Sequence, residues 1–181
     1  MVRDPLVQRA LSGDPRAQRA LYDEHVGRVY RLALGMTRDK EAARDVTQRT
    51  FVRAFERLDQ FRGEAAFSTW LHSIATSLAL EDARKERRRQ ALSVEVEAAG
   101  PRPHGAAGPG DPLLRRRLRA EVDALDPEDR ALLLLFDLEG YSHEEIATLL
   151  GITSGASRVR LHRIRGRLRD RLAPLIEEGT R

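Results

Sequence analysis

The residues from Ser154 to Arg171 carry the side chains best suited to chemistry with a nucleic acid. This stretch, SGASRVRLHRIRGRLRDR, contains seven arginines and one aspartate, so its net charge is +6. A guanidinium group presents its donors as a planar fork, which matches a phosphate or the O6 and N7 atoms of guanine. The stretch therefore predicts a contact with the backbone or the bases of a nucleic acid.

The same stretch has the spacing of an amphipathic helix. Leu161, Ile164 and Leu168 fall three and four residues apart, as apolar side chains do on the buried face of a helix. The arginines occupy the remaining surface of the predicted helix. A solvated charge run on an ordinary bundle helix is the alternative interpretation.

A short helix with clear start and stop signals precedes this basic helix. Ser142 and Glu145 have the spacing of a capping box, and Gly151 suits the left-handed conformation that often ends a helix. A capped short helix, a glycine turn and a basic helix are typical of a helix-turn-helix, whose second helix enters the major groove of DNA. This order favours a DNA-reading helix over a simple charge run.

Further helices are predicted over the first 90 residues. Asp14-Pro15 and Asp39 are N-cap signals, and apolar residues recur at helical spacing after each of them. A loop is expected at residues 59–67, followed by a long helix from Ser68 to Arg89 that ends in the basic run RKERRR. Because no stretch alternates as a strand does, the fold class is predicted to be all-α.

Residues 91–112 break the helical pattern. The part from 100 to 112, GPRPHGAAGPGDP, contains four of the eight prolines and four of the 13 glycines. Such a composition favours a flexible linker and disfavours a helix. We therefore predict two small helical domains, residues 1–90 and 113–181, joined by this linker.

Three signals are expected to bound helices in the second domain. Asp126-Pro127 is a cap followed by a proline at the first helical position. Gly140 is expected to end that helix. Pro174 is expected to limit the basic helix, since proline lacks the backbone N–H that a helix interior needs.

The composition narrows the classes of protein. Of the 181 residues, 32 are basic and 28 acidic, and 30 of the basic ones are arginine, which suits phosphate recognition and equally a GC-rich genome. There is no cysteine, hence no disulfide or thiolate metal site. The longest apolar run, Ala131–Phe136, is too short to span a membrane, and no signal peptide is visible. We expect a cytoplasmic protein without a cofactor.

An enzymatic interpretation finds little support. His143-Glu144-Glu145 lacks the HExxH spacing of a zinc protease, and no Ser/His/Asp constellation or phosphate-binding glycine loop appears. We therefore expect no enzyme activity. The main alternative is a stand-alone helix-turn-helix regulator, in which the first 90 residues would serve as an effector or dimerisation bundle.

Two stretches resemble one family of proteins. Residues 45–89, beginning DVTQRTFVRAF, resemble conserved region 2 of the bacterial extracytoplasmic-function sigma factors, which belong to the sigma-70 family. Residues 137–168, including SHEEIATLLGIT and SGASRVRLHR, resemble their region 4. The resemblance implies a transcription initiation factor that reads −10 and −35 promoter elements. The implied partners are the β′ coiled coil and β subunit of core RNA polymerase, promoter DNA and an anti-sigma factor.

The resemblance assigns polymerase docking to the helix with the pattern D-x-x-Q-E-x-F. The matching residues are Asp45, Gln48 and Phe51, and Arg49 stands where the family has glutamate. We therefore expect Arg49→Glu to bind core polymerase as tightly as the wild type, or more tightly. A diverged sigma-like protein with weakened polymerase binding is a third interpretation.

The resemblance assigns reading of the −10 element to the loop at 59–66 and the helix after it. The expected contacts are aromatic stacking faces, a serine where the family usually has asparagine, and basic residues for phosphates. These candidates are Phe61, Arg62, Trp70, Ser77, Arg84, Lys85 and Arg88. Core packing is the competing interpretation for the aromatic residues, and we favour it for Trp70.

The resemblance assigns reading of the −35 element to the basic helix. The matching residues are Ser154, Ser157, Arg158, Val159, His162 and Arg163. Arg158 and Arg163 can each form a fork to guanine. Val159 replaces a hydroxyl common in the family, so its methyl groups are expected to meet a thymine methyl group.

Overall fold

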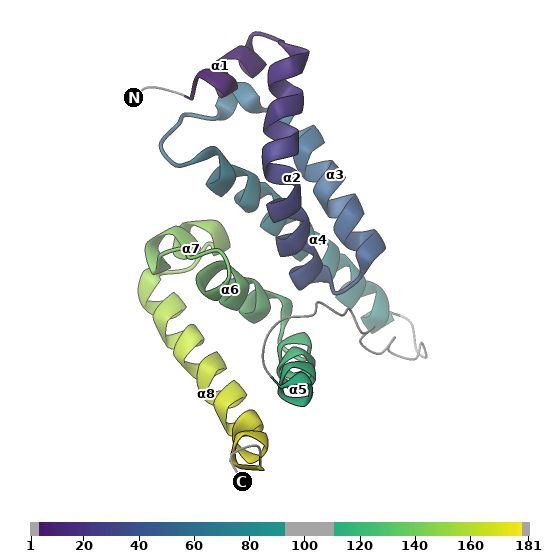
Figure 1. Cartoon of the computed structure of the whole chain (residues 1–181), viewed down its shortest axis with the longest axis vertical. Helices are drawn as coiled ribbons and strands as arrows, with labels where there is room; N and C mark the ends of the chain where they lie inside the picture. Colours follow the sequence, from purple (N-terminus) through teal and green to yellow (C-terminus); the bar gives the residue numbers. More distant parts are fainter. Residues whose placement is uncertain (1–3, 93–110, 179–181) are drawn as a thin grey trace. The chain divides into compact units, whose positions relative to one another are not determined.

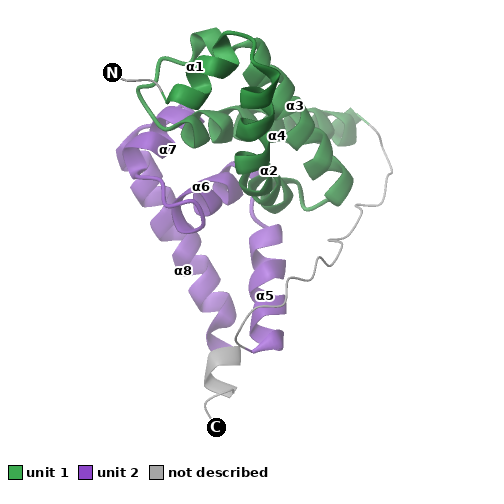
Figure 2. Cartoon of the chain, turned by 45° about the horizontal axis from the view of Figure 1, so that its top comes forward, with its two compact units in different colours: residues 1–94 green, residues 95–181 purple. Residues whose placement is uncertain are grey.

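The computed structural model describes residues 4–92 and 111–178. Within these ranges every regular element is a helix, as the sequence predicts. The chain divides into two compact units, residues 1–94 and 95–181 (Figure 2), and each is considered by itself. The middle of the predicted linker, residues 93–110, lies outside the described residues.

The described part of unit 1 is built from the helices shown in Figure 1: α1 (Pro5–Leu11), α2 (Pro15–Thr37), α3 (Lys40–Glu56), the 3-10 turn η1 (Leu58–Gln60) and α4 (Phe67–Leu92). Local capping explains where two of them begin. The side chain of Asp14 accepts hydrogen bonds from the first backbone N–H groups of α2, and Asp39 does the same for α3. The sequence predicted both starts, whereas it gave no expectation for α1.

Helices α2, α3 and α4 pack against one another, and α1 packs on α2. Their shared interior contains fully or nearly fully buried side chains: Leu21, Val29, Phe51, Ala54, Phe61, Phe67, Leu71 and Ala75. Burying one leucine or phenylalanine contributes about 1.5–3 kcal/mol. The face of each helix that does not enter this interior is therefore available for partners.

The described part of unit 2 comprises α5 (Pro112–Asp123), α6 (Pro127–Asp137), α7 (His143–Leu150) and α8 (Ser154–Glu178). The predicted capping box is formed, since Ser142 Oγ accepts from the N–H of Glu145, whose carboxylate accepts from the N–H of Ser142. Gly151 ends α7 with φ +67°, a left-handed conformation. The helix-turn-helix layout of α7 and α8 is thus present.

Two helix ends in unit 2 differ from the sequence expectations. Helix α6 ends at Asp137, and Gly140 lies beyond it in the turn toward α7. The expectation that Pro174 limits the basic helix is wrong, because α8 continues to Glu178. Proline removes a single N–H donor, and Leu172, two residues before it, is buried in unit 2, so α8 is packed up to the turn that contains the proline.

A buried arginine joins α5 to α6. Arg130 is 2% exposed, and its guanidinium group donates to the backbone carbonyl groups of Val122, Asp123 and Leu125. A buried charge is costly unless it is hydrogen-bonded, and the end of a helix leaves carbonyl groups without partners. These hydrogen bonds satisfy both the buried guanidinium and the carbonyl groups, and they connect α6 to the end of α5.

Candidate nucleic-acid and polymerase interfaces

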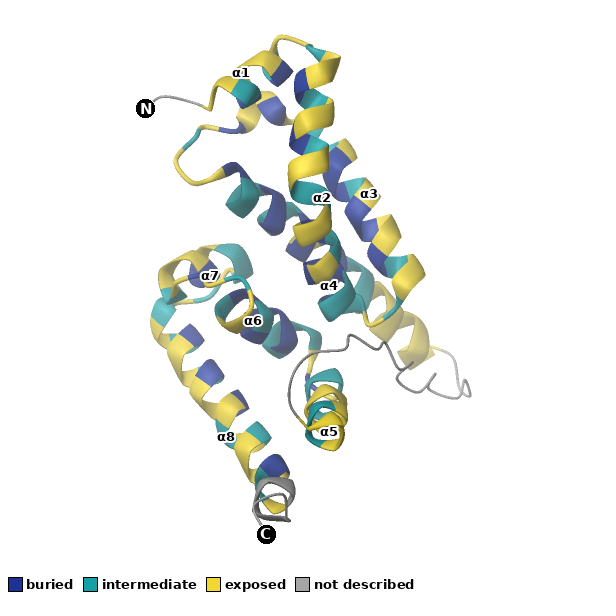
Figure 3. Cartoon of the chain, viewed as in Figure 1, coloured by how far each residue is buried: buried dark blue, intermediate teal, exposed yellow. Residues whose placement is uncertain are grey.

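The outer face of α8 carries four of the residues expected to read the −35 element: Arg158, Val159, His162 and Arg163. All four are exposed, and at about 100° per residue they span about 140° around the helix. Leu161 and Ile164 are buried on the opposite face. Buried positions recur at intervals along α8 in Figure 3, between exposed ones. The helix therefore presents its predicted base-reading residues away from the core of unit 2.

Ser157 lies on the inner face of α8. It is fully buried, and its Oγ atom lies 2.9 Å from Nδ1 of His143 in α7. The ring of His143 in turn packs against Phe136 of α6, with ring centroids 4.6 Å apart. The prediction that Ser157 contacts DNA does not fit this placement, because its spacing from Ile164 puts it on the core side. Ser154, at the first position of α8, is partly exposed.

Three of the seven arginines in the basic run bind to α6. Arg160 and Arg167 form ion pairs with Asp129 at 3.3 and 2.8 Å, and Arg165 pairs with Asp137. These pairs lie on the flanks of α8 and hold it against α6. The sequence predicted none of these pairs, since the acidic partners are about 30 residues away along the chain.

The two candidate base-reading arginines differ in their surroundings. Nη2 of Arg158 donates to Oε1 of Glu144 in α7 at 2.7 Å, and both side chains are exposed. Arg163 forms no ion pair with any residue that the structure describes. Arg158 is thus paired across the helix-turn-helix, whereas Arg163 has no ionic partner among the described residues.

Helix α4 presents a polar and basic face in unit 1. Trp70, Ser77, Arg84 and Arg88 recur at intervals of seven and four residues, which return to nearly the same side of a helix. Ser77 and the basic residues, with Lys85 beside them, are exposed. The candidates for −10 recognition on α4 therefore share one side, opposite the buried His72 and Ala79.

The aromatic candidates pack with one another. Phe61 is 6% exposed, and its ring centroid lies 5.5 Å from that of Phe67 and 5.3 Å from that of Trp70. The prediction that Phe61 offers a stacking face to a base does not fit this burial. Trp70 remains partly exposed, and Arg62, in the loop after η1, is exposed. A base that approached this loop would meet Trp70 and Arg62.

A buried histidine lies beneath this region. His72 of α4 is buried, and burial lowers its pKa to about 4, with further lowering by the nearby His25 and Arg28. His25 belongs to α2, and its ring lies 5.4 Å from that of Phe67. His72 is therefore neutral at physiological pH and serves as a core residue.

The residues expected to dock on polymerase lie on α3. Asp45 and Gln48 are exposed, and Val52, one turn further along, is 52% exposed. Phe51 is buried, with its ring 4.7 Å from that of Tyr22 in α2. Phe51 therefore lies beneath the residues expected to dock on polymerase, and its only open side faces a groove between α2 and α3.

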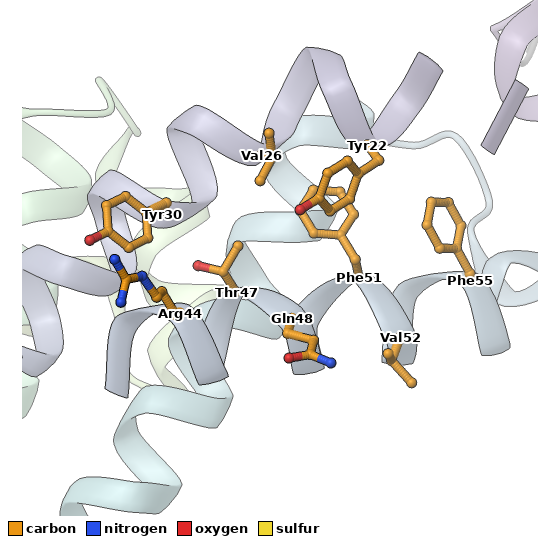
Figure 4. A pocket seen from close by; sticks show the side chains of 9 residues that line it. All are labelled: Tyr22, Val26, Tyr30, Arg44, Thr47, Gln48, Phe51, Val52 and Phe55. Atoms are coloured by element: carbon orange, nitrogen blue, oxygen red, sulfur yellow. The ribbon is translucent and has the colours of Figure 1, made fainter. Parts of the chain in front are cut away.

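A groove of about 570 Å³ runs between α2 and α3 beside these residues (Figure 4). It is lined by Tyr22, Val26 and Tyr30 from α2 and by Arg44, Thr47, Gln48, Phe51, Val52 and Phe55 from α3. The residues from α2 were not among the predicted site residues. No local signal points to them, because the groove exists only where the two helices pack.

Arg49 joins α3 to α4. Its Nη1 atom donates to Asp45 on the same helix at 2.8 Å and to Asp82 of α4 at 2.7 Å. These carboxylates, first Asp82 and then Asp45, hold the pKa of Arg49 above its usual range. The charge of Arg49 is thus neutralised inside unit 1. Arg49 therefore links α3, which carries the residues expected to dock on polymerase, to α4, which carries the −10 candidates.

Among residues 4–92 and 111–178, no three histidine, aspartate or glutamate side chains are grouped as metal ligands. Within the same residues, no helix combines the length and apolar character needed to cross a membrane.

Comparison with known proteins identifies both units. The family model for Sigma-70 region 2 matches residues 21–89, and that for Sigma-70 region 4 matches residues 115–168. The ECF RNA polymerase sigma factor SigE of Mycolicibacterium smegmatis is 40% identical over 158 residues, which cover 84% of this chain and 60% of that protein. RNA polymerase sigma factor CarQ of Myxococcus xanthus is 33% identical over 175 residues, covering 97% of this chain and 100% of that protein.

Solved structures share the fold. The sigma factor RpoE from Bartonella quintana, in complex with the anti-sigma factor NepR, has a TM-score of 0.70 at 21% identity and covers 86% of this chain and 96% of its own. CnrH, in complex with the cytosolic domain of CnrY, has a TM-score of 0.61 at 25% identity, with 96% of each chain covered. With both regions matched in order and a relative such as CarQ matched over its full length, the chain belongs to the extracytoplasmic-function group of the sigma-70 family of RNA polymerase sigma factors.

Proposed function

We propose that the chain directs core RNA polymerase to promoters through three separate surfaces. Helix α3 docks on the polymerase, α4 and the loop before it read the −10 element, and α8 reads the −35 element. As a member of the sigma-70 family, the chain is a transcription initiation factor whose partners are core RNA polymerase and promoter DNA. We place this activity in the bacterial cytoplasm, where both partners are found.

One observation carries the assignment of the −35 surface. Arg158, Val159, His162 and Arg163 share the outer face of α8, opposite Ile164 in the core. A recognition helix needs exposed side chains near its N-terminal end, where they can reach base edges in the major groove. These residues lie in the first three turns of α8, so they fit that requirement.

The docking surface combines charge with an apolar groove. Asp45 and Gln48 supply polar groups, while Val52 and the α2–α3 groove offer apolar contact area. Protein interfaces commonly place such an apolar centre within a polar rim. We propose that the β′ coiled coil of polymerase contacts this stripe and fills part of the groove.

A binding assay with matched variants tests the docking surface. We expect Asp45→Ala combined with Gln48→Ala to weaken binding of the full chain to core polymerase by at least tenfold, as expected when contacts near the centre of an interface are lost. Asp59→Ala combined with Gln60→Ala removes the same two residue types from exposed positions of η1 and is expected to bind normally. Equal core binding by both double variants would refute the assignment.

In vitro transcription tests the function as a whole. Core polymerase with the full chain and genomic DNA is expected to start at discrete sites that share two upstream elements. The stand-alone regulator predicts instead that the chain binds DNA without core polymerase and produces no new starts. Co-purification with core polymerase distinguishes the two interpretations at once.

An anti-sigma factor is the remaining proposed partner, in line with the complex of the related RpoE with NepR. Unit 2 has an apolar groove of about 310 Å³, lined mainly by Leu118, Val122, Leu133, Leu134, Leu138 and Leu168. Leu118 and Leu138 are 40% and 58% exposed, which is unusual for leucines that lie together. We propose this groove as a surface for protein partners, and we expect Leu138→Glu to weaken capture of a co-purifying anti-sigma factor.

A further inference from the structure

Glu144 and Arg158 form an ion pair across the helix-turn-helix. Nη2 of Arg158 donates to Oε1 of Glu144 at 2.7 Å. Glu144 lies in the first turn of α7, and Arg158 is the fifth residue of α8. Their side chains are 62% and 58% exposed, so the pair lies on the outer surface of the two helices rather than in the core of unit 2.

The helices beneath this pair are firmly joined. The hydrogen bond between His143 and the buried Ser157 connects the residue before Glu144 to the residue before Arg158. The capping box of Ser142 and Glu145 fixes the start of α7. The backbone positions of Glu144 and Arg158 are therefore held at a fixed separation, within reach of the ion pair that their side chains form.

A carboxylate beside a recognition arginine affects DNA binding in two ways. It occupies one edge of the guanidinium fork, which orients the remaining N–H groups and lowers the entropy lost when they bind a base. It also repels phosphates, and the first helix of a helix-turn-helix crosses the DNA backbone. Binding to an unrelated sequence, which rests on phosphate contacts, is thereby weakened more than binding to a sequence that offers guanine to Arg158.

We propose that Glu144 is a specificity-determining residue for the −35 element, acting as a positioning residue for Arg158. This inference rests on the proposed function, in which α8 reads duplex DNA. Glu144 does not itself read a base. It directs Arg158 toward one base pair and prevents its charge from binding phosphates indiscriminately.

Glu144→Gln tests the inference, because glutamine keeps the size of the side chain and removes its charge. The full chain in complex with core polymerase would be measured on promoter duplexes and on unrelated duplexes over a range of salt concentrations. We expect binding to unrelated duplexes to tighten about 3–10-fold, and the slope of log K against log salt to become steeper by about one phosphate contact. Discrimination between bases at one −35 position is expected to fall about 5–10-fold, because Arg158 would keep only part of the discrimination that a bidentate contact to guanine gives.

Glu121→Gln is the matched control. Glu121 pairs with Arg117 on α5 at 3.0 Å, so this change removes the same charge and also releases an arginine in unit 2. We expect it to leave base discrimination within twofold of the wild type. An equal loss of discrimination in both variants would show a general effect of net charge and would overturn the inference.

A double-variant cycle with Arg158→Ala shows whether Glu144 acts through Arg158. Residues that act as a unit give non-additive effects, so Glu144→Gln is expected to cause no further loss of discrimination once Arg158 is alanine. Unchanged discrimination and salt slope in the single variant Glu144→Gln would overturn the inference while leaving the proposed function intact. A wild-type complex without base preference in the −35 region would instead overturn the proposed function on which the inference rests.

Discussion

Arg49→Glu is expected to destabilise unit 1, because the side chain of residue 49 lies between two carboxylates. Arg49 donates to Asp45 and to Asp82 of α4 at 2.8 and 2.7 Å. The resemblance to the sigma factors, whose pattern has glutamate at this position, led to an expectation about another property, namely equal or tighter binding to core polymerase. In this chain a glutamate would stand beside both aspartates, and the cross-link between α3 and α4 would become a repulsion.

The size of the effect follows from the exposure of the pair. The side chains of Arg49 and Asp82 are each 35% exposed, so solvent screening limits their attraction to about 1 kcal/mol. The pair with Asp45 on the same helix adds about 0.3–0.5 kcal/mol. Reversing one charge replaces both attractions with repulsions of similar size, for a total of about 2–3 kcal/mol. In a unit of this size that loss lowers the melting midpoint by about 10–20 °C.

Fluorescence of Trp70 reports the unfolding of unit 1 alone, because the sequence contains a single tryptophan and it lies on α4. Three variants separate the contributions. Arg49→Gln removes the attractions without adding repulsion and is expected to lose about half as much stability. Adding Asp82→Arg to Arg49→Glu restores the cross-helix attraction and is expected to recover most of the loss. High salt is expected to reduce the differences in melting midpoint between these variants and the wild type, because it screens the charges.

Two results would refute this reasoning. One is a midpoint for Arg49→Glu within 2 °C of the wild type. The other is a destabilised Arg49→Glu that Asp82→Arg fails to rescue, since the loss would then have a cause other than charge. Binding to core polymerase, measured well below the midpoint, tests docking separately from stability.

Three further predictions use other groups. Arg130→Met should destabilise unit 2 by about 3 kcal/mol, because three carbonyl groups lose their buried donor. Circular dichroism should detect the earlier unfolding of unit 2, whereas the fluorescence of Trp70, which lies in unit 1, should not change. In the complex of the full chain with core polymerase, Arg163→Ala should weaken binding by about 1–3 kcal/mol at one base pair if Arg163 reads a base. If Arg163 binds a phosphate instead, the slope of log K against log salt should fall by about one. Binding to selected duplexes with the affinity and the salt slope of the wild type would contradict its role. Above about pH 6.5, His72 is neutral in the folded and in the unfolded chain. Between pH 6.5 and about 4, only the unfolded chain binds a proton at His72, because burial lowers the pKa in the folded chain. The free energy of unfolding of unit 1 should therefore fall by about 2 kcal/mol between pH 7 and 5. His72→Gln should abolish this decrease, as measured by unfolding followed through Trp70 fluorescence.

The candidate site could be predicted in part. Exposure of Arg158, Val159, His162 and Arg163 follows from helical periodicity, and the structure agrees. The periodicity of Leu161 and Ile164 also places Ser157 inward, but the family pattern led us to assign it to DNA. Phe61 was misplaced for a related reason: an aromatic residue in a loop suits a stacking face or a core equally well, and only its neighbours decide between them.

Local signals in the sequence determined where many helices begin and end. Asp14, Asp39 and the pair of Ser142 and Glu145 each place a hydrogen-bonding side chain next to the N–H groups that a helix start leaves without partners, and Gly151 needs only its own backbone to turn the chain. Such interactions span a few residues, so they can be recognised without knowing how the helices pack. The all-α class follows from them and from the helical spacing of the apolar residues.

Tertiary structure alone decided what each charged side chain does. Arg160, Arg163 and Arg167 look alike in the sequence, yet two of them hold α8 to Asp129 and one faces outward. Arg49 meets Asp82, which lies 33 residues further along the chain. The physical reason is that a charge pair depends on the distance between two atoms. Between separate helices that distance is set by how their apolar faces pack.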